Sequence, residues 1–523
     1  MDLEELDDIP YKEPLIIHNY LDESCDNLQD LDDDDNAKEP VVTEQHVKEM
    51  KTSFGHKTIG SIGSISLLLG NSTGPAMVGL ALQFQHGGWL LTLMGFLLIL
   101  TTSSLAGLFM IESMAAIPRN PRFQLRVEFT MLCRFYFGKW GYIIAQIFIN
   151  ISLQATNIAS IIVCSQVMDS MLIFLFKKTC GLAMYPSVEW VCETVQSESS
   201  SPFTNHYMFF TLGYLIVLVL IIPLGFLNLD DNIIVQIGAV ILMFCITGSW
   251  IIMFCIHGLH ADNMPTIGSP SGVAQIMGNV MFNYAYITTL PSWINEAKPT
   301  VKVNKTVWMS GSISTLIFVS IGMFGALSFP HMPSSSDILS VINSSPQANI
   351  ISKISVYIFP FVVLASSIPV YSIIVRYNLM QNNLMPKWSA NLIATVLPWG
   401  IAIPLMTGNG LNNISNWSSL FFGSIANFII PLLIYLRSIQ FRKARKHMSR
   451  DQIKILKTLI TDTVNWEENE ELLRFQEDHH TMYKVFKGFV REKSKKIAFV
   501  CLIILGILIP LVITTNFVFP SSD

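Results

Sequence analysis

The chain has 523 residues, of which 51% are hydrophobic and 14% charged, with a mean hydropathy of +0.47 and a formal net charge of −5 at pH 7. This apolar composition excludes an ordinary soluble protein of this length and predicts an all-α integral membrane protein. The sequence shows no phosphate-binding loop of the Gly-x-x-x-x-Gly-Lys type and no cysteine and histidine cluster with metal-ligand spacing. We therefore expect no ATP-driven pump, no enzyme, no metal site and no cofactor other than a coupling ion.

The first segment, residues 1–56, is acidic and includes the aspartates 30 and 32–35. It has few aromatic residues and cannot bury enough apolar surface to fold alone. We predict a disordered cytosolic tail, with a role either in solvation or in sorting and regulation.

From residue 58 onward, apolar segments recur with roughly the 20 residues that a helix needs to cross a bilayer. We predict about eleven transmembrane helices, at residues 58–84, 89–112, 138–172, 207–227, 232–256, 271–293, 307–329, 351–375, 388–407, 414–436 and 497–518. The predicted domains are the tail, a ten-helix core at 57–436, a basic cytosolic loop at 437–496, and the eleventh helix with a short non-cytosolic tail at 497–523.

The positive charges are divided unequally between the two sides of these helices. With the N-terminus in the cytosol, all of the 33 lysines and arginines except Lys177, Lys178 and Lys353 belong to the cytosolic side. Because cytosolic loops retain Lys and Arg, we predict a cytosolic N-terminus.

Two outer loops carry candidates for modification. Asn343 lies in an Asn-Ser-Ser acceptor triplet, which predicts a glycosylation site. Cys180 and Cys192 share one outer loop, where they form either a disulfide or two free thiols.

Two predicted helices are interrupted by polar and helix-breaking residues. The first contains the sequence Gly-Asn-Ser-Thr-Gly-Pro at 70–75, and the sixth contains Asn-Tyr-Ala-Tyr-Ile-Thr-Thr-Leu-Pro at 283–291. A membrane helix can break only where its freed backbone groups face protein or a water-filled cavity, so each break predicts a binding site. The alternative is close helix packing and a simple proline kink.

The two breaks lie five helices apart, which favours inverted repeats at 57–256 and 271–436. A half-helix directs free amide groups toward an anion, and freed carbonyls suit a cation or an ammonium group. Together these charges match an amino-acid zwitterion.

The residues around these breaks resemble the amino acid/auxin permease family of the amino acid–polyamine–organocation superfamily. The segment Leu290–Lys298 is similar to the family's Ile-Pro-Ser-x-x-Asn-Glu-x-Lys motif, through Pro291, Asn295 and Glu296. The glycine-rich opening of the first helix and the Gly-Ser and Pro-x-x-x-Tyr-Leu segments of the tenth helix also match. The sequence departs from the family at Ala285-Tyr286, where Ser-Gly is usual, which suggests a different substrate size or chemistry.

The resemblance implies a LeuT-like fold of ten core helices in a 5+5 inverted repeat, with discontinuous helices 1 and 6, plus an eleventh helix. It implies substrate binding at both breaks, by Gly70, Asn71, Ser72, Thr73 and Gly74 and by Phe282, Asn283, Tyr284, Ala285 and Tyr286. The two tyrosines either line the pocket or serve only in packing.

The coupling ion is either a proton or sodium. A sodium site in related transporters uses freed carbonyls of helix 1 and hydroxyls of helix 8, for which the candidates here are Asn71, Ser366 and Ser367. His86 is the histidine of helix 1 that would titrate near neutral pH, unless it serves only at the membrane interface. In helix 3, polar residues at 150, 154, 157 and 160 form a stripe that faces either the pocket or neighbouring helices.

We therefore predict a secondary active transporter, either a symporter or an antiporter, that moves amino acids by alternating access in a vacuolar, lysosomal or plasma membrane. Its expected partners are the amino-acid substrate and the lipid bilayer, and no nucleic acid. Two alternatives remain: a membrane amino-acid sensor that uses the same pocket, and an ion channel, which the paired breaks disfavour.

Overall fold

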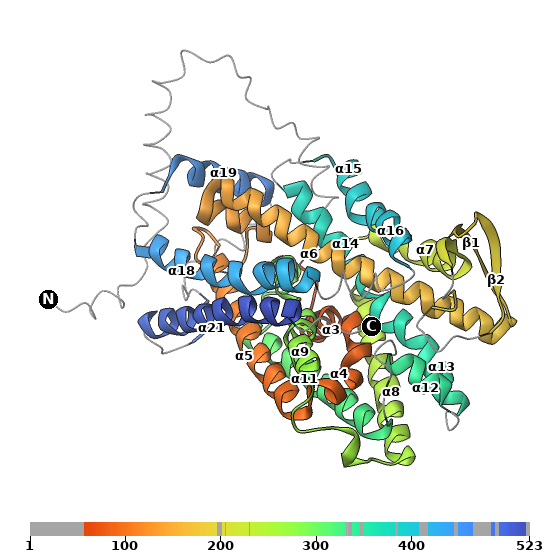
Figure 1. The fold of residues 1–523 in the computed structure, drawn as a ribbon. Helices are drawn as coiled ribbons and strands as arrows, with labels where there is room; N and C mark the ends of the chain where they lie inside the picture. Colours follow the sequence, from red (N-terminus) through yellow and green to blue (C-terminus); the bar gives the residue numbers. More distant parts are fainter. Residues whose placement is uncertain are drawn as a thin grey trace.

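The computed structural model describes residues 57–120, 122–195, 201–203, 206–229, 231–330, 332, 337–345, 349–381, 385–406, 417–443, 448–463, 483–486 and 491–518. Most of these residues are helical (Figure 1). The helices up to the middle of the chain are α3 (Ser61–Ser72), η1 (Pro75–Gly79), α4 (Leu80–Gly87), α5 (Trp89–Ala115), α6 (Phe129–Phe176), α7 (Leu212–Gly225), α8 (Ile233–His257) and η2 (Ala261–Asn263).

The next helices are α9 (Pro270–Asn283), η3 (Ile287–Thr289), α10 (Leu290–Glu296), α11 (Val303–Ser328), α12 (Ile338–Ser344), α13 (Ile350–Phe359), η4 (Pro360–Leu364) and α14 (Ser367–Met380). The last are α15 (Lys387–Asn391), η6 (Leu392–Val396), α16 (Leu397–Ala402), η7 (Ile403–Leu405), η8 (Ser419–Gly423), η9 (Ile425–Ile429), α18 (Ile430–Lys443), α19 (Arg450–Thr463) and α21 (Arg491–Val518).

Among the described residues, eight helices are long and apolar enough to cross a membrane, and nine if the bent pair α3 and η1–α4 is one span. The short α7 and the interrupted segment α9–η3–α10 occupy the positions of two further predicted spans. The count of eleven therefore stays a prediction.

The longest helix, α6, runs across the bundle (Figure 1). It starts nine residues before the predicted span at 138, because two helices join at Gly138. That glycine has φ 74°, a backbone conformation that costs glycine little. The residues before it lengthen α6 beyond the predicted span.

A small sheet, which the sequence did not indicate, lies at one end of α6 (Figure 1). Its order is β2-β1-β3, and both pairs are antiparallel, with β1 at Thr179–Tyr185, β2 at Glu189–Glu193 and β3 at Tyr207–Thr211. The prediction of a helix from residue 207 was wrong over β3. A short apolar run fits a strand or a helix equally well, and here the pairing with β1 decides.

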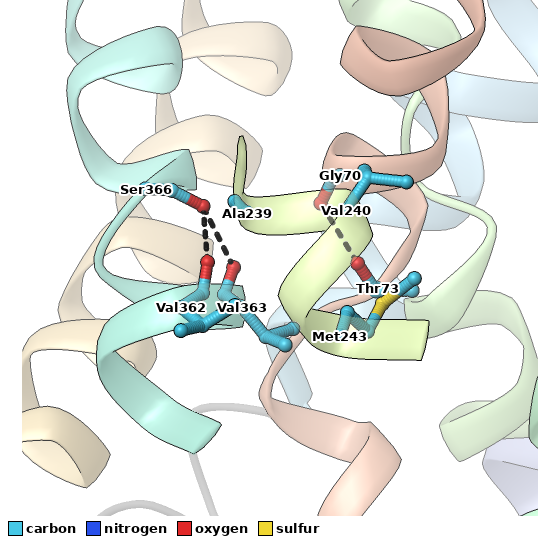
Figure 2. Close-up of a pocket in the computed structure, with 8 residues that line it drawn as sticks. All are labelled: Gly70, Thr73, Ala239, Val240, Met243, Val362, Val363 and Ser366. Atoms are coloured by element: carbon cyan, nitrogen blue, oxygen red, sulfur yellow. Dashed lines mark hydrogen bonds between the residues drawn. The ribbon is translucent and has the colours of Figure 1, made fainter. Parts of the chain in front are cut away.

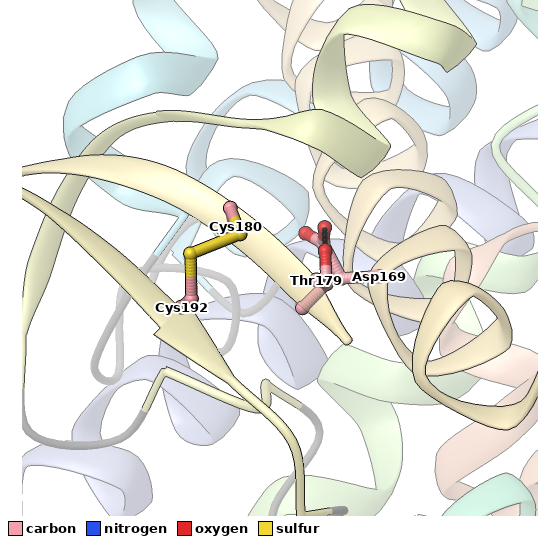
Figure 3. The surroundings of a disulfide bond; sticks show 4 residues. All are labelled: Asp169, Thr179, Cys180 and Cys192. Atoms are coloured by element: carbon pink, nitrogen blue, oxygen red, sulfur yellow. Dashed lines mark hydrogen bonds between the residues drawn. A yellow bond between two sulfur atoms is a disulfide. The ribbon is translucent and has the colours of Figure 1, made fainter. Parts of the chain in front are cut away.

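A disulfide joins Cys180 and Cys192, which face each other across β1 and β2 (Figure 3). Beside it, the buried Asp169 at the end of α6 accepts hydrogen bonds from the Thr179 hydroxyl at 2.8 Å and from the Gly213 amide at 2.9 Å. The sheet is thus fixed to α6 and α7 at one point and closed on itself at another.

Replacing both Cys180 and Cys192 by serine should loosen this hairpin and leave transport unchanged. A disulfide that closes a loop of this length contributes about 3 kcal/mol by restricting the unfolded chain. We expect faster cleavage of the hairpin in limited proteolysis and a lower thermal midpoint, with an unchanged uptake rate. Equal cleavage rates for the variant and the wild-type protein would contradict the prediction.

Within the predicted loop at 437–496, the structure describes α19, which packs on α6. The Gln452 side chain donates to the Phe135 carbonyl at 3.0 Å, and Ile455, Leu456 and Leu459 are buried. The predicted tail at 1–56 lies outside the described residues, and the predicted domain limits stay predictions.

Candidate functional site

The break in the first membrane segment lies between α3 and η1. The direction of the chain changes there by 58°, from α3 to the combined segment η1–α4. In a continuous helix, the amide of residue 75 would bond to the Asn71 carbonyl, but Pro75 has no amide hydrogen. The Asn71 carbonyl instead accepts the Tyr371 hydroxyl of α14 at 2.6 Å. The Gly70 carbonyl likewise accepts the Ser367 hydroxyl at 3.0 Å. Hydroxyls of α14 therefore satisfy the backbone groups that the break frees.

The second break lies between α9 and α10, where Tyr284 leaves the helical conformation and η3 follows. The Thr289 hydroxyl donates to the Tyr286 carbonyl at 2.6 Å and accepts from the Asn71 side-chain amide at 3.2 Å. The Thr288 amide donates to the side chain of Asn427 at 3.1 Å. The Asn71–Thr289 hydrogen bond brings the two breaks into direct contact.

Helix α11 closes the site from another side. The hydroxyl groups of Ser72 and Ser314 are hydrogen-bonded, as are those of Tyr284 and Thr315. Most of the ten predicted substrate residues are buried, and Ala285 is half-buried. Any substrate therefore reaches the breaks only after helices move.

Buried polar atoms at the breaks include some that have no hydrogen-bond partner within the described part of the chain. Among these are the side-chain oxygens of Asn71, Asn283 and Thr288. A buried acceptor without a partner costs free energy, so such atoms point to a bound ligand or water.

A small cavity lies beside the first break, between α3, α8 and η4 (Figure 2). Its lining includes the predicted ion-site residue Ser366, together with Gly70 of α3 and Thr73, which follows α3 directly. Ser367 contacts the same Gly70 carbonyl. The structure therefore brings together the ion-site candidates at the end of α3 and those between η4 and α14.

His86 lies away from this group, near the end of α4. Its side chain is half-buried, and its carbonyl accepts the Ser269 amide at 2.9 Å. The structure does not bring His86 to either break.

The polar stripe predicted for the third membrane helix lies on α6 and contacts neighbouring helices. The Asn157 side chain donates to the Ser372 hydroxyl of α14 at 3.2 Å, and Gln154 donates to the Ile393 carbonyl of η6 at 2.9 Å. Between the two interpretations of this stripe, these contacts favour helix packing.

The matched family motif lies at one end of the bundle, where the sequence alone did not indicate its partners. Glu296, whose side chain is fully buried, pairs with Arg126 at 2.7 Å. Asn295 donates to Glu128 at 2.9 Å, and Ser292 donates to the same carboxylate at 2.5 Å. Arg126 and Glu128 lie in a short connection without periodicity, so no pattern could have linked them to α10.

Arg126 also binds this cluster to α14. Its guanidinium lies 4.7 Å from the centre of the Tyr377 ring, and its carbonyl accepts the Gln381 side chain at 2.8 Å. In the segment just before α3, the Ile59 amide donates to the Glu296 carbonyl at 3.1 Å. These contacts, which we call the inner cluster, join the start of α3, the end of α10 and the end of α14.

Glu112 and Asn343 also have partners away from the breaks. Glu112 accepts the Arg442 guanidinium at 3.0 Å and the Val485 amide at 3.0 Å. The side chain of Asn343 in α12 accepts a hydrogen bond from the Tyr357 hydroxyl of α13 at 3.1 Å. Glycosylation of Asn343 stays a prediction.

Comparison with solved structures identifies the fold. The transporter Mhp1, of the nucleobase-cation-symport-1 family and in a closed conformation with bromovinylhydantoin bound, aligns with 12% identity and a TM-score of 0.54, covering 90% of this chain and 96% of that chain. A variant of the Eremococcus coleocola manganese transporter aligns with 14% identity and a TM-score of 0.45, covering 94% of this chain and 99% of that one. The likeness to Mhp1 confirms the predicted LeuT-like fold.

Among curated proteins, none matches the sequence significantly. Residues 57–459 match the family described as transmembrane amino acid transporter protein, which covers most of the chain and confirms the predicted resemblance. The chain therefore belongs to the transmembrane amino acid transporter protein family, and it is a multi-pass membrane transporter rather than an enzyme.

Proposed function

We propose that this protein moves amino acids across a membrane by alternating access, driven by a proton or sodium gradient, with its N-terminus in the cytosol. One observation carries the proposal: two helix breaks meet through the Asn71–Thr289 hydrogen bond and leave buried oxygens without partners. Acceptor oxygens suit the ammonium group of an amino acid, and the start of a half-helix suits its carboxylate.

The inner cluster supports alternating access. By charged and polar contacts, it ties the start of α3 to the ends of α10 and α14, which face the cytosol in the proposed orientation. Opening toward the cytosol separates these ends, whereas opening toward the other side leaves them joined. A bundle that rocks against a scaffold would make and break such contacts once in each cycle.

The coupling ion would bind at the cavity between α3, α8 and η4. Gly70, Thr73 and Ser366 line this cavity with oxygen atoms, which are the ligands that a hard cation prefers. The same oxygens would accept hydrogen bonds from a protonated water molecule. The membrane of residence is that of an acidic organelle or the plasma membrane.

Binding and flux together test this proposal against the sensor alternative. A panel of radiolabelled amino acids would be tested for binding to the purified protein and for uptake into proteoliposomes. We expect at least one amino acid both to bind and to accumulate. Binding without uptake under a pH gradient or a sodium gradient would favour the sensor.

Lys57 should make the inner closure depend on pH. Its ammonium donates to the Ile294 carbonyl at 3.4 Å. Burial, and then the charge of Arg126, lower its pKa from 10.5 to about 8, while Glu296 acts in the opposite direction. Between about pH 8 and about pH 10.5, a water-exposed Lys57 keeps its proton and the buried one does not. Rising pH in this window therefore favours the closed conformation, and below about pH 8 the effect levels off.

The measurement is the labelling rate of a cysteine at Ser64, a buried position of α3, by a thiol reagent supplied from the cytosolic side. Relative to a free thiol, Ser64→Cys should be labelled several-fold more slowly at about pH 9.5 than at about pH 7.5. Adding Lys57→Met should remove this dependence. The same pH response with and without Lys57 would contradict the prediction.

A further inference from the structure

Gln236 is a fully buried carboxamide on α8, a helix that is otherwise strongly apolar. Its side-chain nitrogen donates to the Ser366 carbonyl at 2.5 Å. Ser366 comes just before α14, whose Ser367 and Tyr371 hydroxyls donate to the carbonyls of the first break. This amide reaches from α8 to Ser366 and Gly70, two residues that line the cavity of Figure 2, although Gln236 itself does not line it.

The oxygen of the same amide has no hydrogen-bond partner within the described residues. It faces Gly70, because a methyl carbon added there would lie 2.4 Å from this oxygen. Rotating the amide by half a turn would place its oxygen against the Ser366 carbonyl, two acceptors at a hydrogen-bond distance, which is unfavourable. The unpaired oxygen of Gln236 is therefore held toward the break.

The neighbouring cavity has room for roughly one water molecule and is too small for an amino acid. The hydroxyls of Thr73 and Ser366 on its wall donate to carbonyls of their own helices. Their lone pairs stay available as acceptors. Among the residues that the structure describes, no Lys, Arg or His lines this cavity, so its polar chemistry is that of oxygen acceptors.

We propose that the Gln236 oxygen is a ligand of the small monovalent cation that drives transport, a sodium ion or a protonated water molecule. This inference rests on the proposed function, since it assigns a cation ligand to helix α8 in addition to those of α3 and η4–α14. Through Ser366, the same side chain holds α8 against the segment that carries the other ligands. Cation binding would then fix three helices in one arrangement.

The test measures cation binding without transport, so that it can fail independently of the proposed function. Thermal unfolding of the purified protein is followed at constant ionic strength while sodium replaces choline, and separately while the pH is lowered without sodium. We expect one of these titrations to raise the unfolding midpoint of the wild-type protein, because a ligand of the folded state stabilises it. The titration that does so identifies the cation.

Gln236→Leu keeps the size of the side chain and removes the oxygen, and we expect it to raise the half-stabilising cation concentration at least tenfold. Gln236→Glu should lower that concentration for sodium, because a carboxylate is a stronger ligand. Thr247→Val is the matched control, since Thr247 is buried on the same helix and donates only within it. It should titrate like the wild-type protein.

Two results would overturn the proposal. One is a wild-type protein whose midpoint responds to neither cation, even if it transports amino acids. The other is a folded Gln236→Leu variant that titrates like the wild-type protein. If Gln236→Leu does not fold, Gln236→Glu decides, because an unchanged response of that variant to the cation that stabilises the wild-type protein has the same meaning.

Discussion

Arg126→Ala is expected to abolish accumulation of the amino acid. The change leaves Glu296 and Glu128 buried beside each other without the guanidinium that pairs with Glu296 at 2.7 Å. Removing one partner of a buried ion pair costs about 3–5 kcal/mol, or roughly two to four powers of ten in an equilibrium constant. The inner cluster should then stay open, and the substrate gradient should leak away. The measurement is the ratio of internal to external amino acid in proteoliposomes.

Lys139→Ala is the control for this variant, because Lys139 is exposed on α6 and belongs to the same predicted cytosolic side. It should accumulate substrate like the wild-type protein. A second variant, Arg126→Met combined with Glu296→Gln, removes both charges of the pair and should fold better than Arg126→Ala alone. Wild-type accumulation by a folded Arg126→Ala protein would show that the inner cluster does not control closure.

Gly70→Ala is expected to lower the transport rate about tenfold or more. The added methyl group would lie 2.4 Å from the Gln236 oxygen, which cannot retreat without losing the bond from its nitrogen to Ser366. Overpacking of this kind costs roughly 1–3 kcal/mol. The strain falls on the contact between α3 and α8, directly beside the first break. Initial rates of uptake measure the effect.

Gly238→Ala is the matched control, because an added methyl group there meets no atom within 4 Å. It lies two residues after Gln236 on α8, and the Gly238→Ala variant should transport normally. Gly70→Ala combined with Gln236→Ala removes the clash, so it should bind substrate better than Gly70→Ala alone. Normal transport by Gly70→Ala would contradict the close approach of Gln236 to α3.

The sequence carried enough information to locate both breaks, for a specific physical reason. Pro75 and Pro291 remove amide donors inside apolar segments, and polar residues beside them have no other solvent. The structure interrupts the first segment just before Pro75 and the sixth at Tyr284, ahead of Pro291 in α10. Motif and composition thus predicted the position of the site, because backbone chemistry at a break is local.

The partners of the site could not be predicted, because they depend on which helices become neighbours. Nothing near Tyr371 or Ser314 in the sequence indicates that these hydroxyls reach Asn71 and Ser72. Gln236 is the single carboxamide of a largely apolar helix and carries no periodic signal. The strand β3 was likewise mistaken for helix, since only its pairing with β1 distinguishes the two.

The roles of the predicted residues differ in how far geometry supports them. Ser366, Ser367 and Asn71 come together at the first break, whereas His86 lies near the far end of α4. A helical position predicts which face a residue occupies, but a bend of 58° changes what lies beside it. Such a change in direction is set by the whole bundle.

The central measurement is gradient-driven accumulation of an amino acid in proteoliposomes that contain the purified protein. A labelled amino acid is supplied under an imposed pH gradient, an imposed sodium gradient, or neither, and the internal concentration is followed before and after an ionophore dissipates the gradient. We predict accumulation above the external concentration under one gradient and its collapse when that gradient is lost. Equilibration to the external concentration under every condition would contradict coupled transport.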